Sequence, residues 1–583
     1  MLTLDRRTFL ASLAGSFIAG ESLSAAPPKP QPLPTGTCWL DVAAPFVVVD
    51  PAQQLTTDLL LTATCFPGID GYKNSNFATD YQILLYDASG KEIKLENSGK
   101  FSIPALRPTL LSMKDLSGRD AFVGGAKIRL APSPNQVPRA GDLFSAGFVR
   151  WNLPENFDNV HAHPAPPQQI VGHYNYTMPF PAMSEYHCAF ALFNPNDEES
   201  YGVVRVVDRL GRAAVERKFS LRPHQTTLYT LADLHPVETA GEALALRPLA
   251  ESKLKDGGVV IVRNESERVP FAYTLMKGRQ GQSFTVEHPL HFSADAPMKP
   301  ARATPYGPNR SFPAQALIYT PMLFKGLKIG GVELDSRVYF SSSRWVEEAL
   351  WKMPFVTTDR GEIAWVSNRD DQFASRVLPS AVTDQGVVRL TEFQSCRIAA
   401  RDLPLPDGFS GGFGAACIPK TSHSLNKIEV RAVNWNRVAM THFRPGGAVA
   451  KSYRQVENRG ALASDYIVSG AHLIKGKRDC LLAIMNIEFE DDFTGTPRLQ
   501  VFGPQGLAGE KQLSDFPPLA CRHFLLSDLF PDIESDPAHP FTVRMQVPNA
   551  LMIVSALHLD YVRKDLALEH GSDRHSTFQD FKC

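Results

Sequence analysis

The sequence lacks the excess of basic charge that binding to a polyanion requires. Its 60 basic and 61 acidic residues leave a formal net charge of −1. Nucleic acids and anionic membranes attract proteins mainly through clustered Lys and Arg, so neither class of partner is expected. Beyond the amino-terminal segment, no run approaches the roughly 18 apolar residues that a membrane-spanning helix needs. We therefore expect no transmembrane segment in the mature chain.

Short motifs of several common sites are absent as well. The chain has no H-E-x-x-H zinc motif and no G-x-x-x-x-G-K-[ST] phosphate loop, and its eight cysteines form no C-x-x-C pair. These spacings carry metal binding, phosphate binding and redox chemistry. Their absence favours a non-enzymatic protein. Glycoside chemistry would escape this test, because its paired carboxylates can lie far apart in the sequence.

The amino terminus has features expected of an export signal. The segment DRRTFLA at 5–11 overlaps a mild apolar stretch at 10–19, and small residues follow at 24–26. It resembles a twin-arginine (Tat) signal peptide, with Arg6 and Arg7 as the arginine pair. The resemblance implies export of a folded protein to the periplasm or to the outside of the cell. A Sec signal that happens to contain two arginines is the alternative.

A strand–turn–strand cassette ending in Asp-Leu recurs along the chain. The clearest copies run over 203–234 and 498–529, and fainter copies run over 81–116 and about 376–403. Self-similarity of this kind indicates an array of like modules. We therefore expect about four modules, in agreement with the chain length.

The second and fourth modules agree best with each other. A C-x5-N run occupies 188–194 in one and 480–486 in the other, and a looser copy occupies 363–368. A turn glycine follows each run, at Gly211, Gly506 and Gly386 respectively. In modules two and four the C-x5-N run, the turn glycine and the Asp-Leu end fall in the same order. Because modules one and three are fainter, this favours a duplicated two-module unit.

Short apolar strands joined by Gly, Pro and Asn turns are typical of antiparallel β-sandwiches. The spacing also resembles the Ig-like repeats of many secreted bacterial proteins. The sequence thus predicts an all-β chain of tandem antiparallel Ig-like β-sandwich modules. The expected parts are a signal peptide at 1–26, a proline-rich spacer at 27–35, modules at 36–157, 168–293, 311–447 and 460–570, a linker at 294–310, and a polar tail at 571–583.

The cysteines leave two interpretations open. Three pairs within modules would be compatible with disulfides formed after export: Cys38 with Cys65, Cys396 with Cys417, and Cys480 with Cys521. A protein that folds in the reducing cytoplasm before export cannot depend on disulfides to reach its native state. Buried free thiols in strands are the alternative.

The densest group of histidines lies between the first two modules. His161, Ala162 and His163 form an H-x-H pair, and His173 follows. In an extended strand such a pair points both imidazoles to one face, which suits Zn, Cu or Fe when a third ligand approaches. The sequence therefore predicts His161, His163 and His173 as candidate metal ligands. Solvated histidines in a polar linker are the alternative.

Acidic loops follow Asn194, Asn368 and Asn486. Several carboxylates in one loop can hold Ca²⁺ through hard oxygen ligands. None of these loops has the order of an EF-hand, and a solvated turn that protects a sheet edge is the alternative.

Two Glu-His pairs recur at matching places. Glu287-His288 follows the last strand of module two, and Glu569-His570 follows that of module four. Because a catalytic dyad would more naturally occur once, the recurrence indicates a structural part in closing each half.

The sequence favours an exported non-enzymatic protein that serves as a structural or binding module in the cell envelope, with an envelope protein or a glycan as candidate partner. The first alternative is a metal-dependent periplasmic enzyme or metal-binding protein that uses the histidine group named above. The second is a carbohydrate-binding protein that uses Trp151, Tyr174 and Tyr176.

Overall fold

The structure of the chain is a computed structural model. It describes residues 40–62, 78–104, 106–131, 147–153, 157–161, 163–164, 174–245, 253–279, 284–288, 290–293, 316–341, 350–365, 388–391, 393–418, 426–442, 444–446, 464–488 and 494–573. Within these ranges helix is limited to short segments: α2 (Met113–Ser117), α4 (Ala240–Ala243), α6 (Leu526–Leu529) and the 3-10 turns η2 (Glu96–Gly99), η4 (Ala400–Asp402) and η5 (Val433–Trp435). The remaining elements are strands in antiparallel sheets, which confirms the all-β prediction.

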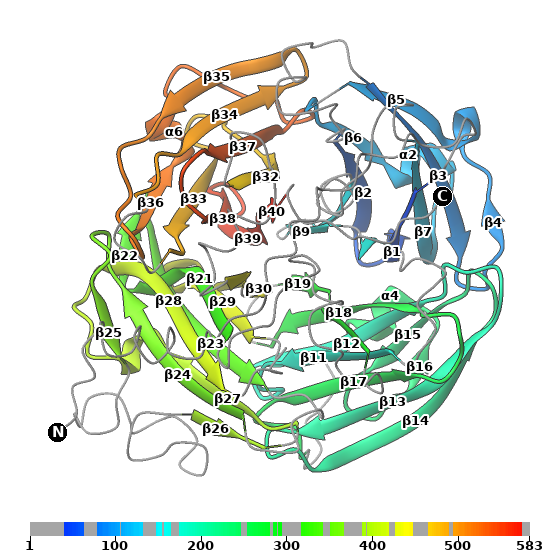
Figure 1. Cartoon of the computed structure of the whole chain (residues 1–583). Coiled ribbons are helices and arrows are strands. Elements are labelled where there is room, and N and C mark those ends of the chain that lie inside the picture. Colours follow the sequence, from blue (N-terminus) through cyan, green and yellow to red (C-terminus); the bar gives the residue numbers. More distant parts are fainter. Residues whose placement is uncertain are drawn as a thin grey trace, which may run out of the picture.

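Four β-sandwich modules stand side by side around a ring (Figure 1). Module two contains the sheet β14 (Ala213–Leu221), β13 (Ser200–Asp208), β17 (Gly258–Asn264), β11 (Tyr174–Phe180), β20 (Leu290–Ser293) and the sheet β16 (Pro236–Val237), β15 (Thr226–Thr230), β12 (Tyr186–Phe193), β18 (Phe271–Gly278), β19 (Phe284–Glu287). Module four contains the sheet β35 (Gly506–Gln512), β34 (Arg498–Gly503), β37 (Phe541–Val547), β32 (Ser464–Ala471), β40 (Ser572–Asp573) and the sheet β36 (Cys521–Leu525), β33 (Arg478–Asn486), β38 (Met552–Asp560), β39 (Asp565–His570).

The other two modules repeat this strand order. Module three contains the sheet β25 (Ile363–Trp365), β24 (Leu350–Thr357), β28 (Phe409–Ile418), β21 (Ala316–Lys325), β31 (Arg444–Gly446), with β26 (Val388–Leu390) beside β24, and the sheet β22 (Leu327–Ile329), β23 (Val332–Ser341), β29 (Asn426–Ala432), β30 (Arg437–His442), with β27 (Ser395–Ala399) beside β23. Module one contains β4 (Glu92–Ile93), β3 (Ala78–Asp87), β7 (Phe122–Ala131), β1 (Leu40–Asp50), β2 (Leu55–Leu61), β8 (Gly147–Asn152) and β9 (Phe157–His161), with β10 (His163–Pro164) beside β1, β5 (Lys100–Pro104) beside β3 and β6 (Thr109–Ser112) beside β2.

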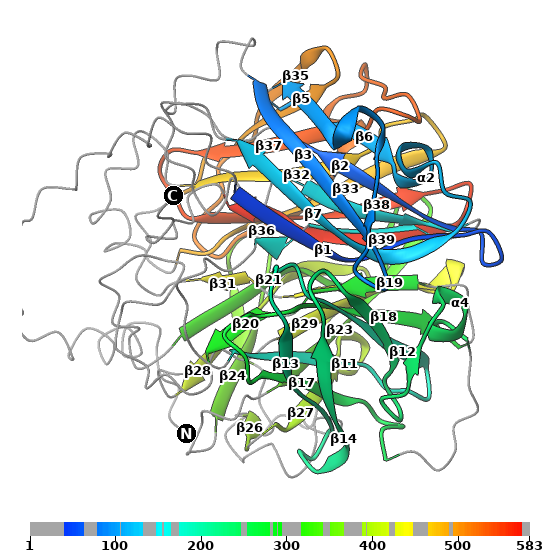
Figure 2. The same ribbon diagram turned by 90° about the vertical axis from the view of Figure 1, so that its right-hand side faces the viewer.

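All four modules therefore share one topology. In module one the two sheets are joined, because β1 also pairs with β2. The last strands, β9 and β10, extend that module past the expected end at 157, and β40 places 572–573 in the sheet of module four. Seen from the side, β1, β18 and β39 run from one face of the ring towards the other (Figure 2).

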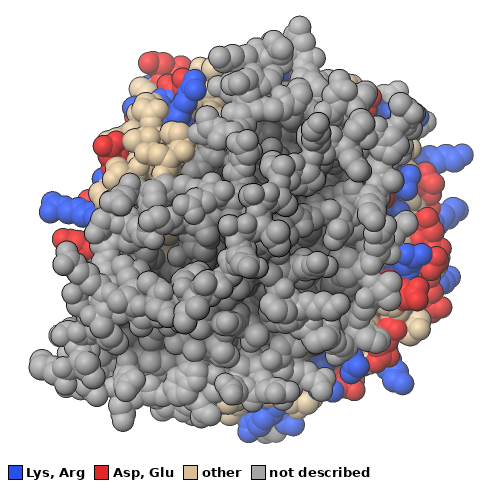
Figure 3. All heavy atoms as spheres, viewed as in Figure 1, with Lys and Arg blue, Asp and Glu red and all other residues tan. Residues whose placement is uncertain are grey.

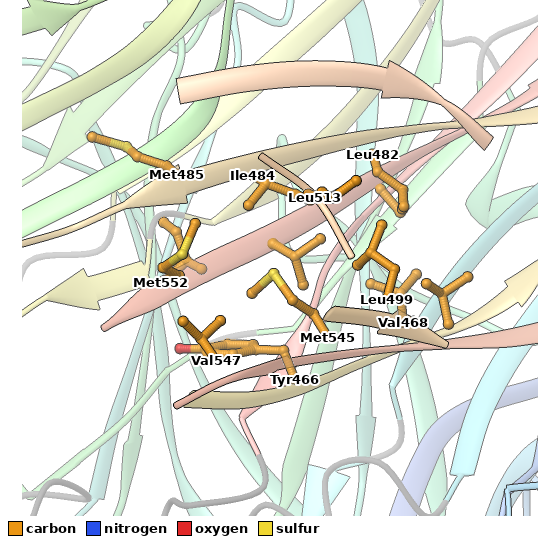
Figure 4. Packing of buried hydrophobic residues seen from close by; sticks show 14 of the residues in the cluster. Tyr466, Val468, Leu482, Ile484, Met485, Leu499, Leu513, Met545, Val547 and Met552 are labelled. Carbon is orange, nitrogen blue, oxygen red and sulfur yellow. The ribbon is translucent and has the colours of Figure 1, made fainter. Parts of the chain in front are cut away.

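In modules two and four, one strand of the second sheet, β12 or β33, is buried on both faces. In β12, Cys188, Phe190 and Leu192 face the core of module two, whereas Ala189 and Ala191 belong to the core of module one. In β33, Leu482 and Ile484 face their own core (Figure 4), whereas Leu481 and Ala483 pack with module three. Burial on both faces makes a strand a continuous apolar run without alternation. The C-x5-N runs of modules two and four are such strands.

The module-four core in Figure 4 shows how one sandwich is filled. Side chains from β32, β33, β34, β37 and β38 meet between its two sheets. The labelled residues are Tyr466, Val468, Leu482, Ile484, Met485, Leu499, Leu513, Met545, Val547 and Met552. Burial of such residues typically contributes about 1.5–3 kcal/mol per side chain, so each sandwich has a substantial core of its own.

The asparagine that ends each of these runs ties down the following loop. The Asn194 side-chain amide donates to the carbonyls of Glu198, Leu221 and Arg222. The Asn486 amide donates to Phe516 O, and its Oδ1 accepts from Glu488 N. The recurrence of Asn therefore has a structural cause, because one side chain satisfies several buried backbone groups.

At three of the four junctions a tight turn of one module accepts a backbone hydrogen bond from the next module. The turn after β13, from Asp208 to Gly211, offers its Arg209 carbonyl to the amide of Ser395 at the start of β27. The turn after β3 does the same through Ala88 O and Thr226 N, and the turn after β24 through Thr358 O and Cys521 N. The turn glycine in module three is thus Gly361, and 363–365 is the strand that follows it. The sequence-based assignment of 363–368 to a C-x5-N run was wrong. Residues 363–365 form β25, the strand that follows the turn, and resemble such a run only in their apolar composition.

The donor of this hydrogen bond directly follows a second recurrent turn. This turn lies just before β6, β15, β27 and β36, and its third residue has a left-handed backbone, at Leu106, His224, Phe393 and Leu519. Glycine is the usual residue at that conformation. Here a larger side chain contacts the preceding module: Phe393 packs on Val207, Val259 and Ile261, and the His224 ring stacks 4.1 Å from that of Tyr86. Leu106 packs with Ile467 and Phe502, which closes the ring between modules four and one.

Two of the proposed disulfide pairs are excluded. Cys396, Cys480 and Cys521 are buried free thiols. Cys521 lies opposite Met485, five residues along β33 from Cys480. That offset corresponds to roughly 16 Å of strand, whereas a disulfide needs Cα atoms within about 7 Å. Cys38 and Cys65 lie outside the described residues.

The turn of module three offers a test of ring packing. A Cβ added at Gly361 would lie 2.0 Å from Pro518 O of module four, and the φ of Gly361 is +80°. Gly408 has the same left-handed conformation (φ +82°) but nothing within 4 Å of an added Cβ. We expect Gly361→Ala to lower the unfolding free energy by about 1–3 kcal/mol more than Gly408→Ala, because only the first displaces a neighbouring module. Equal urea midpoints for the two variants would contradict this packing.

Candidate functional site

The centre of the ring is formed by one strand from each module. We call β9, β19, β30 and β39 the axial strands. Each contacts the next in a closed cycle, β9 with β19, β19 with β30, β30 with β39, and β39 with β9. They surround the middle of the molecule in Figure 1. Sites between modules are common binding places, so this axis is the candidate functional site.

Polar contacts cross the module boundaries on or beside the axial strands. The carboxylate of Asp158 on β9 accepts a hydrogen bond from the amide of Val286 on β19 at 2.5 Å. Lys427 Nζ lies 3.3 Å from Glu287 Oε2, and both side chains are fully buried. Arg150 Nη1 of module one lies 3.0 Å from His472 Nε2 of module four. Together with Arg437 Nε and Asp565 Oδ1 at 3.6 Å, a polar contact thus lies near the axis at each of the four module boundaries.

These surroundings shift several pKa values. Burial lowers the pKa of Lys427, and Glu287 opposes that shift. Burial together with the positive charges of Arg150 and Arg478 lowers the pKa of His472 to about 2. The ring is therefore neutral and accepts the hydrogen bond that the Arg150 guanidinium donates. Burial likewise lowers the pKa of His558 to about 3.

A second charged cluster joins modules two and three away from the axis. Glu185, in the turn before β12, forms ion pairs with Arg337, Arg397 and Arg431 of module three. Burial alone would raise the pKa of Glu185, but the three guanidinium groups lower it. One half-buried carboxylate shared by three Arg side chains helps to align the two modules, because charge-assisted hydrogen bonds from Arg337 and Arg431 require defined geometry.

His161 and His163 do not share one strand. His161 ends β9, opposite Phe148, and His163 begins β10, opposite Ala43. His161 and His163 are therefore not alternating residues of a single extended strand. His173 lies outside the described residues. Metal binding by His161, His163 and His173 stays a prediction. Among the described side chains, no three His, Cys, Asp or Glu residues converge as a metal-ligand set.

The acidic loop of module two is occupied by its own ion pairs. Glu198 pairs with Arg268 at 2.7 Å, and Asp197 lies 3.1 Å from His224. In module four, Glu488 is buried and accepts from Leu551 N. For the module-two loop these contacts favour the solvated-turn interpretation over a Ca²⁺ site, whereas residues 489–493 of the module-four loop lie outside the described residues. The loop after Asn368 lies outside the described residues.

One spacing in the chain mimics a hydrolase motif. Gly408-Phe409-Ser410-Gly411-Gly412 fits G-x-S-x-G. Ser410, however, lies within β28, paired opposite Phe324. A nucleophile elbow needs a sharp strand-to-helix turn that exposes the serine, so this strand does not provide one.

Trp151 is not available to a carbohydrate. Its side chain is fully buried, its indole N–H donates to Phe46 O at 3.0 Å, and its ring packs edge-on against Tyr273 of module two at 5.6 Å. Trp151 is therefore a core residue at a module junction. The side chains of Tyr174 and Tyr176 are outside the described part of the structure.

Part of this site is visible in the sequence. His161, Glu287-His288 and Glu569-His570 stand out there, and all lie on or directly after axial strands. The single polar residues Lys427, Arg150 and His472 do not, because a single polar residue in an apolar strand gives no indication of its partner. The recurrence of histidine after each axial strand was the signal that could have located the axis.

The buried histidines make stability depend on pH. His472 and His558 have folded-state pKa values of about 2 and about 3, against an ordinary value near 6.5. Between the folded-state pKa and pH 6.5, the unfolded chain binds a proton at each histidine that the folded chain does not bind. The free energy of unfolding is therefore unaffected by these histidines above pH 6.5 and decreases as the pH falls below 6.5. Each histidine contributes a slope of about 1.4 kcal/mol per pH unit. We expect His472→Gln to flatten the dependence of the urea midpoint between pH 6.5 and 4.5. The exposed His539, changed to Gln, is the matched control, and an equally steep profile in His472→Gln would contradict the assignment.

None of the helices in the described ranges has the length and apolar character that crossing a membrane requires. No protein-family model and no curated protein matches the chain.

Proposed function

We propose that the protein is an exported, non-enzymatic β-sandwich ring that acts as a structural or binding module in the cell envelope. The observation that carries the proposal is that charged side chains at the module boundaries are paired with one another. At the axis, Lys427 and Glu287 neutralise each other across two modules. Glu185 is likewise surrounded by guanidinium groups of its neighbour. Groups engaged in this way stabilise an assembly, whereas catalysis needs a group that can change its charge state at a substrate.

The periphery supports the same proposal. Figure 3 shows Lys and Arg interspersed with Asp and Glu along the rim of the described surface. The outermost strand β14 carries Glu216, Arg217 and Lys218 in succession, and Arg205 pairs with Glu216 across to β13. Charged side chains on an edge strand prevent pairing with another sheet. The surfaces left for a partner protein or a glycan are the loop ends of the sandwiches.

Export follows from the resemblance of the amino terminus to twin-arginine signals. That route carries folded proteins, and a closed ring whose first and last modules must meet benefits from completing its fold before transport. Free buried thiols in modules two, three and four agree with folding in a reducing compartment. The proposed location is the periplasm or the outside of the cell.

The function is tested with metal-free protein purified from its export route. Panels of model esters, glycans and phosphodiesters should show no turnover above the uncatalysed rate, whereas an immobilised ring should retain a defined envelope protein or glycan. Turnover at rates typical of enzymes, about 1 s⁻¹ or more, that co-purifies with the protein would overturn the proposal.

The export route has its own test. We expect Arg6→Lys/Arg7→Lys to leave the folded precursor in the cytoplasm, because a twin-arginine signal requires the arginine pair. A Sec signal depends on positive charge, which lysine preserves, so it would tolerate the exchange. Cell fractionation followed by immunoblotting distinguishes the two. Normal export of the double variant would assign the segment to the Sec route.

A further inference from the structure

The junction between module four and module one differs from the other three. We call it the closing seam, because it joins the last module of the chain to the first. The recurrent turn before β6, β15, β27 and β36 is closed in the same way in every module. Its hydrogen bonds run from Arg107 N to Pro104 O, Gln225 N to Arg222 O, Gln394 N to Thr391 O and Ala520 N to Pro517 O. The residues that directly follow these turns are therefore equivalent.

The residue after this turn donates a hydrogen bond to the neighbouring module at three junctions. The donors are Thr226, Ser395 and Cys521. At the closing seam the equivalent residue is Pro108. Proline has no backbone N–H, so the closing seam lacks the bond that aligns the modules at the other three junctions.

The turn glycines indicate that the closing seam is also packed less closely. A Cβ added at Gly90 would lie 2.3 Å from Pro223 O of module two, as close to neighbouring backbone as at Gly361. The glycine at the same place in module four is Gly506, and its φ is likewise positive. The three atoms nearest to its added Cβ all belong to the Arg107 side chain, the first at 3.5 Å. The module-four turn therefore meets a flexible side chain where the others meet backbone.

The described side chains that face the closing seam are mostly polar. Strand alternation separates them from the side chains that face the core of their own module. On the module-four side, β32 and β37 present Asp465, Ile467, Ser469, Thr542, Arg544 and Gln546. On the module-one side, β8 and β2 with the residue after it present Asp58, Leu60, Thr62, Arg150 and Asn152. The described apolar cluster across the seam consists of Leu106, Ile467 and Phe502.

Several of these polar groups have partners within their own module. The Arg544 guanidinium donates two hydrogen bonds to the Asp465 carboxylate, at 2.8 and 2.7 Å. In module one, the Asn152 amide donates to Asp58 at 2.8 Å. Such pairs stay together when the two modules separate. The contacts of Arg150 with His472 and of Thr62 with Ser469 cross the seam, and water can take the place of either partner in both.

At the other junctions, neighbouring modules share apolar cores. The core of module one includes Tyr273 and Leu275 of module two. The core of module three includes Leu557 and Leu559 of module four, and the core of module two includes Met440 of module three. Separation at any of these junctions would expose apolar surface to water, which is unfavourable.

We propose that the ring opens at the closing seam, so that the folded protein passes between a closed ring and an open row of four modules. Opening there exposes a mostly polar face on each side and leaves the four cores intact. The missing N–H of Pro108 and the loose fit at Gly506 place the opening at this junction. This conformational role goes beyond the proposed structural or binding function and does not depend on it.

A permanently closed ring is the competing explanation. The side chains at the seam would then reach solvent only when module four or module one unfolds. The two explanations therefore differ in which buried side chains become accessible under native conditions, and at what rate relative to the module cores.

The test is native-state thiol labelling of the full chain, with each site read by peptide mass spectrometry. Ser469→Cys and Thr62→Cys place a thiol on either side of the closing seam, at side chains that are 0 % exposed. Cys480 and Cys521, both buried free thiols of module four, are the matched internal controls. We expect the two introduced thiols to react at least about tenfold faster than the controls, because opening of the seam exposes them without unfolding a module.

Equal rates at all four sites would overturn the proposal, because exposure would then require unfolding. Fast labelling at position 469 with slow labelling at position 62 would overturn it as well, since the opening would lie within module four. If Ser469→Cys fails to fold, both controls label at the rate of the unfolded chain. Thr542→Cys, on the same face and also 0 % exposed, then takes its place.

Pro108→Ala, combined with Ser469→Cys, tests the cause of the opening. The substitution supplies the N–H that the other three junctions have. We expect labelling at position 469 to slow by roughly two- to tenfold, the effect of one net hydrogen bond, with labelling of Cys480 changed less. An unchanged rate at position 469 would overturn the assignment of Pro108 as the cause.

Discussion

The structure depends on burying both faces of the same sheets. Strands such as β12 and β33 present apolar side chains to their own core and to the neighbouring module. A single module would expose the second face to water, at a cost of about 25 cal/mol for each Å² of apolar surface. The ring removes this cost where two modules share a core, and contact with a neighbour is therefore a condition of stability for such modules.

Directional polar contacts then determine how the modules are aligned. Apolar packing tolerates sliding, whereas a backbone hydrogen bond such as Ser395 N to Arg209 O requires one register. The left-handed residues Leu106, His224 and Phe393 add a side chain at the same junctions, in a conformation that costs roughly 1–2 kcal/mol. Retention of this strain in several modules indicates that the contact outweighs it.

The sequence predicted the sandwich class and the match of modules two and four, because strand periodicity, the C-x5-N runs and the Asp-Leu ends are local features. It misplaced the third copy, since β25 resembles the apolar run of another strand. The ring itself was not predictable, because which modules touch depends on packing between faces that single strands do not identify. At the axis, the recurrent Glu-His pairs were visible, but the pairing of Lys427 with Glu287 joins residues 140 positions apart.

The turn that joins neighbouring modules uses different surfaces on the two partners. Such a head-to-tail interface has no internal symmetry, so it continues until rotation brings the last unit back to the first, or else forms an open filament. Here the contact of Leu106 with Ile467 and Phe502 ends the series after four units. The number of modules is thereby fixed by the angle between them, and a lineage that gained or lost one module would have to change every junction at once.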